Sequence, residues 1–150
     1  MSEQYNIRPM RFTDIEQVLV VEQDSFQMPW TSKAFVNELV KNPFAHYFVA
    51  DDGRDIIGYC GIWIVMEEAH ITNIAVLSGY RHQGVGQSLV KAMIEQSFKL
   101  GVQTITLEVR ETNTRAQQFY RQFGFRKIDV EKGYYTDNNE DAWIMSLTFD

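Results

Sequence analysis

Apolar side chains recur every three or four positions through the first third of the chain, which is the spacing of one face of a helix. They fall into two series, and the first contains a single polar member, Glu22. The apolar members are Ile15, Val18, Leu19, Phe26, Phe35 and Leu39. Two helices are therefore predicted, the first opened by the capping-box pattern at 13–16 and the second beginning near Thr31 or Ser32.

The next segments have the pattern of strands. Segment 44–51 is rich in aromatic residues, 56–66 is a continuous apolar run, and 69–77 is rich in β-branched residues. A turn at 51–53 separates the first two segments. Three consecutive antiparallel strands are predicted, with a short strand over 5–8 before the first helix.

The remaining chain returns to a mixture of helices and strands. The predicted segments are a helix from Val85 to Gly101, a strand over 102–110, a helix over 113–123 ended by Gly124, and strands over 125–130 and 142–149 around a loop at 133–141. A strand, a helix and a strand form a right-handed crossover, so 69–77 and 102–110 should run parallel. The prediction is one domain over 1–150, of the α+β class, with a mixed sheet.

The composition indicates a folded chain and limits the kinds of partner that it could bind. Hydrophobic residues make up 45% and charged residues 23% of the 150 residues, as in ordinary globular proteins. No apolar run reaches the about 20 residues of a membrane span, and the N-terminus lacks a secretory pattern, so we expect a cytoplasmic protein away from membranes. The net charge of −6 argues against nucleic-acid binding and favours a basic partner. The single cysteine, Cys60, is expected to be a buried, unreactive thiol.

A glycine-containing turn joins the predicted strand at 69–77 to the following helix. Its residues are Arg81, His82, Gln83, Gly84, Val85, Gly86 and Gln87. The first amides of a helix have no partner within it, so this turn could bind an anion such as a phosphate. The alternative is that Gly84 and Gly86 only permit a tight connection. The turn is neither a Rossmann fingerprint nor a P-loop.

The order of several motifs resembles the GNAT acetyltransferase superfamily over nearly the whole chain. These motifs are Asn73-Ile74-Ala75-Val76, the turn at 81–86, Leu107-Glu108-Val109-Arg110, Asn113, and the segment 119–125. Segments 28–30, 133–135 and 140–142 look more narrowly like ribosomal-protein-alanine N-acetyltransferases of the RimI type, and the last two also like eukaryotic N-terminal acetyltransferases. The resemblance implies the GNAT fold, a mostly antiparallel sheet of about six or seven strands with helices on both faces and a splayed central parallel pair.

The resemblance also implies a site for acetyl-coenzyme A. The backbone of Ile74, Ala75 and Val76 would pair with the pantetheine arm, and the Val76 amide would face the thioester carbonyl. Residues His82 to Gln87 would hold the pyrophosphate, with Arg81 adding charge, and Asn113 would bind near the pantetheine end. The family often has Arg or Lys where this chain has His82, which predicts weaker or more pH-dependent coenzyme binding.

Two residues are similar in position to the family's acid–base pair. Glu108 would accept the proton of the amine, and Tyr120 would donate one to the leaving thiolate. The alternatives are an ion pair between Glu108 and Arg110, and simple core packing for Tyr120. Trp30, Tyr134 and Tyr135 are expected to flank an acceptor groove. His46 and His70 are interpreted as structural, and no metal is expected.

The acceptor implied by the resemblance is a protein α-amino group, above all the N-terminal alanine of small-subunit ribosomal protein eighteen. A basic ribosomal target agrees with the acidic net charge. Two alternatives stay open: a GNAT enzyme acting on a lysine side chain, polyamine or other small amine, and a coenzyme-A-binding interaction module. The sequence assigns no oligomeric state.

Overall fold

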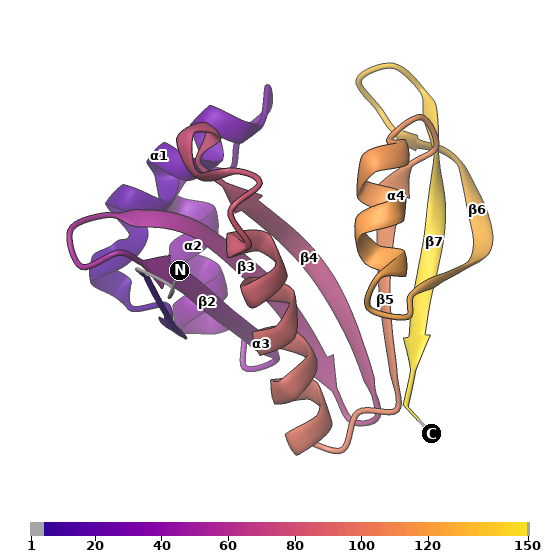
Figure 1. Cartoon of the computed structure of the whole chain (residues 1–150), viewed down its shortest axis with the longest axis horizontal. Coiled ribbons are helices and arrows are strands. Elements are labelled where there is room, and N and C mark those ends of the chain that lie inside the picture. Colours follow the sequence, from indigo (N-terminus) through magenta and orange to yellow (C-terminus); the bar gives the residue numbers. More distant parts are fainter. Residues whose placement is uncertain (1–4, 150) are drawn as a thin grey trace.

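A computed structural model describes residues 5–149 (Figure 1). The strands are β1 (Asn6–Pro9), β2 (Ala45–Asp51), β3 (Ile56–Val65), β4 (Glu68–Val76), β5 (Thr104–Arg110), β6 (Arg126–Tyr135) and β7 (Glu140–Thr148). The helices are α1 (Ile15–Ser25), α2 (Ser32–Lys41), α3 (Val85–Lys99) and α4 (Thr114–Arg121), with short 3-10 turns η1 (Phe12–Asp14) and η2 (Ser78–Tyr80). No helix within 5–149 is long and apolar enough to cross a membrane.

The seven strands form one sheet in the order β1-β2-β3-β4-β5-β7-β6. Every neighbouring pair is antiparallel except β4 and β5, which are parallel. Their register covers only Glu68–His70 against Thr104–Thr106, and beyond these residues the two strands diverge (Figure 1). The mixed sheet and its splayed parallel pair confirm the predicted fold class.

Helices cover both faces of the sheet. α1 and α2 lie on one face, and α3 and α4 lie on the other (Figure 1). Val18, Phe35 and Tyr59 are fully buried on the first side, and Leu89 and Met93 on the second. Burial of this kind is a main source of stability, since truncating a buried phenylalanine to alanine costs about 3–5 kcal/mol.

Helix termini follow several of the predicted signals. The Thr31 side chain accepts a hydrogen bond from the Ala34 amide and begins α2, as predicted (3.2 Å). Gly101 adopts the left-handed conformation, with a φ of 81°, just after α3. Asn113 caps α4 through the Ala116 amide.

The capping box predicted at 13–16 is wrong. Residues 12–14 form η1, and α1 begins only at Ile15. The Asp14 carboxylate instead accepts a hydrogen bond from the Arg11 amide (2.7 Å) and pairs with Arg8 of β1 (2.8 Å). The Arg8 guanidinium lowers the pKa of Asp14 below its ordinary value. This ion pair connects β1 to the start of α1. No side chain caps α1 in the way that the pattern at 13–16 predicted.

The predicted loop at 133–141 is also wrong, because β6 continues to Tyr135 and pairs with Glu140. Gly133 has a φ of 62°, and its amide donates to Asp141 of β7 (2.9 Å). The register of the two strands shifts across this segment, so Gly133 occupies an irregularity within the strand rather than its end. Tyr134 therefore belongs to strand β6 rather than to a loop.

Candidate active site

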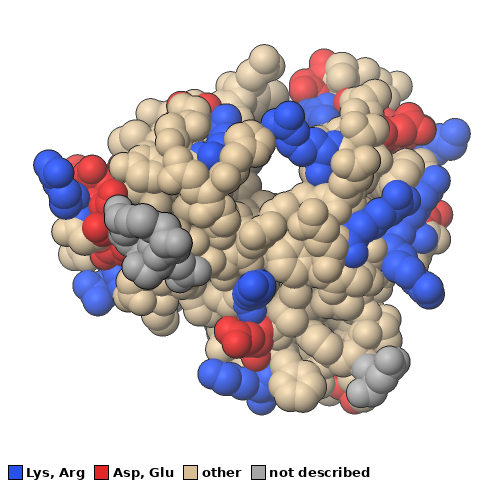
Figure 2. Space-filling view, viewed as in Figure 1, with Lys and Arg blue, Asp and Glu red and all other residues tan. Residues whose placement is uncertain are grey.

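The gap between β4 and β5 contains two cavities. The carboxylate cavity, of about 880 Å³, is lined by the α1–α2 connection, β4, β5 and the turn between β6 and β7. The turn cavity, of about 730 Å³, is lined by the end of β4, the turn before α3, and α4. Figure 2 shows the molecule hollowed between its two halves. The residues that line both cavities are Ser25, Phe26, Ile74, Asn113, Ala116 and Tyr120.

The far end of β4 has an open edge along this gap. The Leu77 amide donates to the Ile57 carbonyl of β3 (2.8 Å). Because successive residues of a strand point their backbone groups to opposite sides, those of Ile74 and Val76 face the side that β5 has left. The side chain of Arg81 already uses one of these groups, since its Nε donates to the Val76 carbonyl (2.9 Å). Ala75 lines the turn cavity beside Ile74 and Val76, but its backbone groups point to β3, where it pairs with Tyr59. The predicted pairing of its backbone with the pantetheine arm is therefore wrong.

The turn before α3 has the backbone expected of an anion site. His82 and Gly84 have φ values of 65° and 85°, and α3 starts at Val85. The Ser88 amide is bonded to the Gly84 carbonyl, which closes the first helical turn. Helical geometry leaves the amides before Ser88 without partners inside the helix. His82, Gly84, Gly86 and Gln87 line the turn cavity together with Arg81.

Two residues of the predicted turn are placed differently from their neighbours. Val85 is 2% exposed and packs in the core, so its backbone alone could reach a ligand. Gln83 is not among the residues that line the turn cavity, and its side chain donates to the Gly79 carbonyl (3.3 Å). Gln83 therefore stabilises the turn through this hydrogen bond and does not line the predicted coenzyme site.

Glu108 of β5 faces the carboxylate cavity and is held by two side chains. The Nε2 atom of His70 lies 2.8 Å from each Glu108 oxygen, and the Tyr134 hydroxyl donates to Oε1 (3.3 Å). The predicted alternative, an ion pair with Arg110, is not formed. The interpretation of His70 as purely structural missed its contact with Glu108. His46 contacts Gln96 of α3, and burial lowers its pKa.

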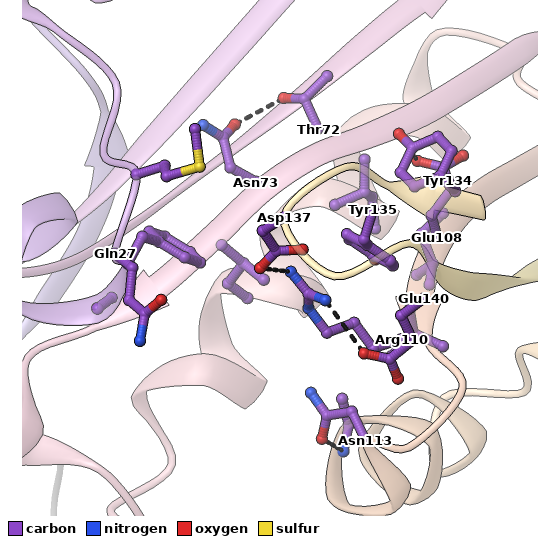
Figure 3. Close-up of a pocket in the computed structure, with 18 of the residues that line it drawn as sticks. Gln27, Thr72, Asn73, Glu108, Arg110, Asn113, Tyr134, Tyr135, Asp137 and Glu140 are labelled. Atoms are coloured by element: carbon purple, nitrogen blue, oxygen red, sulfur yellow. Dashed lines mark hydrogen bonds and ion pairs between the residues drawn. The ribbon is translucent and has the colours of Figure 1, made fainter.

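Arg110 organises the other wall of the carboxylate cavity. It pairs with Asp137 (2.9 Å) and Glu140 (3.1 Å), and its guanidinium lies 4.0 Å from the centre of the Tyr135 ring (Figure 3). Hydrogen bonds from Thr112, reinforced by Arg110, lower the pKa of Glu140 to about 2. Burial raises the pKa of Tyr135 to about 12. Sequence reasoning did not find this network, because its members lie on two segments, 110–112 and 135–140, that are far apart along the chain.

Tyr120 of α4 lies at the boundary of the two cavities. Its ring packs edge-on against Phe119 and Phe125, at 5.2 and 5.7 Å between centroids. The side chain is 7% exposed, and burial raises the pKa of its phenol above the ordinary value. Tyr120 therefore both packs in the core and lines the cavities, so its two predicted roles are compatible.

The connection between α1 and α2 is held by Glu22, the single polar member of the first helical series. Glu22 is 3% exposed and accepts hydrogen bonds from the Trp30 amide (2.8 Å) and the Tyr59 hydroxyl. Asn73 of β4 donates to the same hydroxyl (3.1 Å). The Trp30 ring packs on Phe35. Trp30, Tyr134 and Tyr135 all line the carboxylate cavity.

The thiol of Cys60 lies in the core and lines neither cavity. Cys60 is buried, as predicted, with its thiol near the Leu89 carbonyl, and burial raises its pKa. Across residues 5–149, no group of three or more His, Cys, Asp or Glu side chains has a geometry that could hold a metal ion.

Comparison with known proteins identifies the fold and its relatives. Residues 14–125 match the family described as the Acetyltransferase (GNAT) family. A protein of Bacillus subtilis (strain 168), described as a candidate ribosomal protein bS18-alanine N-acetyltransferase, is 45% identical over 142 residues, which cover 95% of this chain and 94% of that protein. The ribosomal protein bS18-alanine N-acetyltransferase of Escherichia coli (strain K12) is 32% identical, with 94% of this chain and 95% of that protein covered.

Solved structures agree with the sequence matches. The crystal structure of the ribosomal-protein-S18-alanine N-acetyltransferase from Escherichia coli superimposes with a TM-score of 0.88 at 32% identity, covering 96% of this chain and 93% of that one. Arabidopsis thaliana NAA60, solved in complex with acetyl-CoA, has the same fold, with a TM-score of 0.85 at 20% identity over 97% of this chain and 98% of that one. Taken with the splayed sheet and the turn before α3, these matches show that the chain belongs to the GNAT family of acetyltransferases.

Proposed function

We propose that the protein transfers the acetyl group of acetyl-CoA to the α-amino group of a protein N-terminus, and that its acceptor is the N-terminal alanine of ribosomal protein bS18. The observation that carries this proposal is the meeting of two cavities at Tyr120 and Asn113. One cavity offers helix amides and an open strand edge, and the other offers a carboxylate. Relatives at 45% and 32% identity carry the name of this activity.

The turn cavity suits the coenzyme. The unpaired amides at the start of α3, together with the positive end of its dipole, would hold the pyrophosphate, with His82 beside it. The amide groups of the pantetheine arm would pair with the open edge at Ile74 and Val76. A guanidinium has five N–H donors, so Arg81 could keep its bond to the Val76 carbonyl and still reach a phosphate oxygen. Asn113 would bind the arm where the cavities meet.

The carboxylate cavity suits a primary amine. A protein α-amino group has a pKa of about 7.7–8.0, so most of it is protonated at neutral pH and cannot attack. Glu108 would take this proton, directly or through water, and pass it to solvent before the free amine attacks the acetyl carbon. It would take the second N–H proton as the tetrahedral intermediate collapses to the amide. The Val76 amide would stabilise the oxyanion, a contribution whose loss typically costs about 10²–10³ in rate. As the carbon–sulfur bond breaks, Tyr120 would donate its proton to the sulfur.

The acceptor's identity is supported by charge as well as by the relatives. The chain has a net charge of −6, and Glu22, Asp137 and Glu140 line the carboxylate cavity together with Glu108. Such a site favours a basic peptide over an acidic one. A ribosomal acceptor places the reaction in the cytoplasm.

The test offers labelled acetyl-CoA to matched acceptors. The panel contains a basic peptide beginning with alanine, the same peptide with a blocked N-terminus, a blocked peptide containing lysine, and spermidine. We expect label on the free N-terminus alone. Label confined to lysine or spermidine would contradict the choice of acceptor, and coenzyme binding without transfer to any amine would favour an interaction module.

A further inference from the structure

His70 lies where β4 and β5 separate, directly beside Glu108. It pairs with Thr106 at the last position of the parallel register. Glu108 follows Thr106 by two residues, and side chains two apart on a strand share a face. The imidazole therefore meets the carboxylate at the mouth of the gap, with its Nε2 atom 2.8 Å from both oxygens.

We infer that His70 is a positioning residue for Glu108, which holds the carboxylate toward the acceptor and releases it as a base only when the imidazole is neutral. This inference rests on the proposed function, because it assigns a role to the base of that reaction. It adds a histidine of β4 to an acid–base pair that is otherwise drawn from β5 and α4.

The two protonation states of His70 act differently on Glu108. A neutral imidazole that donates from Nε2 orients the carboxylate and leaves it able to accept a proton. A positively charged imidazolium at the same distance favours the ionised carboxylate and makes it a poorer proton acceptor. The proton on the imidazole therefore sets how readily Glu108 accepts a proton from the amine.

Within residues 5–149, His70 is the one basic side chain that forms an ion pair with Glu108. The side chains of His70 and Glu108 are 35% and 18% exposed, so solvent protons can reach the imidazole. From β6, Tyr134 donates to Glu108, and from β3 the Trp63 ring faces the imidazole at 6.5 Å. Glu38 of α2 accepts from the Trp63 indole, and Glu68 lies on the same face of β4 as His70. The basic residues of α2 and β6, which are Lys33, Lys41, Arg126, Lys127 and Lys132, form no ion pair with Glu108, and Arg110 of β5 pairs with Asp137 and Glu140 instead.

The test measures log(kcat/KM) against pH, from about pH 5.5 to 8.5, for the accepted peptide. Each group that must lose a proton contributes a slope of about one. We expect the wild-type protein to approach a slope of about two toward the acid end of this range, from the amine and the imidazole together. His70→Gln keeps an N–H donor but cannot become charged, so its slope should stay near one.

A second variant separates orientation from packing. His70→Leu keeps much of the volume and removes the donor, so kcat at pH 8 should fall about tenfold or more, as expected for a lost hydrogen bond to a charged group. Its dissociation constant for acetyl-CoA, measured by calorimetry, should match the wild-type value and show that the variant is folded. The matched control is His46→Gln, which replaces the histidine of β2 and should keep the wild-type pH profile.

The outcomes separate the two proposals. A wild-type slope in His70→Gln, or wild-type kcat in His70→Leu, would overturn the role of His70 and leave the acetyltransferase standing. A wild-type protein that acetylates no amine would overturn both.

Discussion

Glu108 and Tyr120 both line the carboxylate cavity, but their surroundings differ. The carboxylate lies at a cavity wall with donors on two sides, whereas the phenol is packed among aromatic rings. Burial raises the pKa of Tyr120, so its proton stays in place throughout the neutral range. In the proposed mechanism, the carboxylate is accessible to the amine proton, and the phenol is still protonated when the thiolate forms.

Replacing Glu108 by glutamine tests the first of these roles. We expect Glu108→Gln to lower kcat by about 10²–10⁴-fold, the usual contribution of a general base, with little change in acetyl-CoA affinity. The remaining rate should move to higher pH, because solvent must then deprotonate the amine. Steady-state kinetics across pH measure both effects, with the exposed neighbour Glu111→Gln as control. An unchanged pH–rate curve would remove Glu108 as the base.

Replacing Tyr120 by phenylalanine separates chemistry from packing. Tyr120→Phe keeps the ring between Phe119 and Phe125, so the thermal midpoint should change little, while kcat should fall at least about tenfold. Tyr120→Leu removes the ring as well and should also lower the thermal midpoint. Wild-type turnover in Tyr120→Phe would leave Tyr120 with its packing role alone.

At the scale of elements, the hairpin of β6 and β7 forms a wall of the carboxylate cavity, and Arg110 at the end of β5 fastens it. Arg110 reaches Asp137 and Glu140 of the hairpin, and Glu140 also accepts from the Thr112 amide (3.0 Å). The geometry of the acceptor site therefore depends on contacts between β5 and a distant hairpin.

Removing this attachment should loosen the acceptor site and leave the coenzyme site intact. We expect Arg110→Leu to raise KM for the peptide by about tenfold, the size of losing one hydrogen bond to a charged group, with acetyl-CoA affinity unchanged. Arg126→Leu, at the exposed start of β6, is the matched control. Equal peptide KM values for the two variants would show that the attachment of the hairpin does not matter for binding.

Most elements could be predicted from the sequence, because periodicity and capping residues are local properties. The starts of α2 and α4 and the order of the elements along the chain follow from such patterns. The extent of β6 does not, since Gly133 looks like the end of a strand until its partner Asp141 is known. The contact of His70 with Glu108 also escapes, because it depends on the register of β4 against β5, which neither strand specifies alone.

At the scale of the whole molecule, net charge and the position of the carboxylates should influence how the acceptor arrives. An acidic surface of charge −6 attracts a basic peptide over distances comparable to the Debye length, about 10 Å at 0.1 M salt. We expect kcat/KM for a basic acceptor to fall severalfold when salt is raised from about 0.05 to 0.5 M. An acceptor of the same length without net charge should change little, and an equal response of both would exclude electrostatic attraction.

The short register between β4 and β5 has a consequence for the stability of the empty protein. Three residue pairs join the two halves of the sheet there, and past them β4 is paired with β3 but has no strand on the side of β5. A coenzyme that pairs with this edge would act as a removable eighth strand, so part of the folding free energy would be supplied by a metabolite. The free energy of unfolding should then increase by about 2.7 kcal/mol at a coenzyme concentration 100 times the dissociation constant. The melting temperature should rise with acetyl-CoA concentration accordingly. Thermal melts across a series of coenzyme concentrations would measure this, and the cell's supply of acetyl groups would help to decide how long each copy of the enzyme survives.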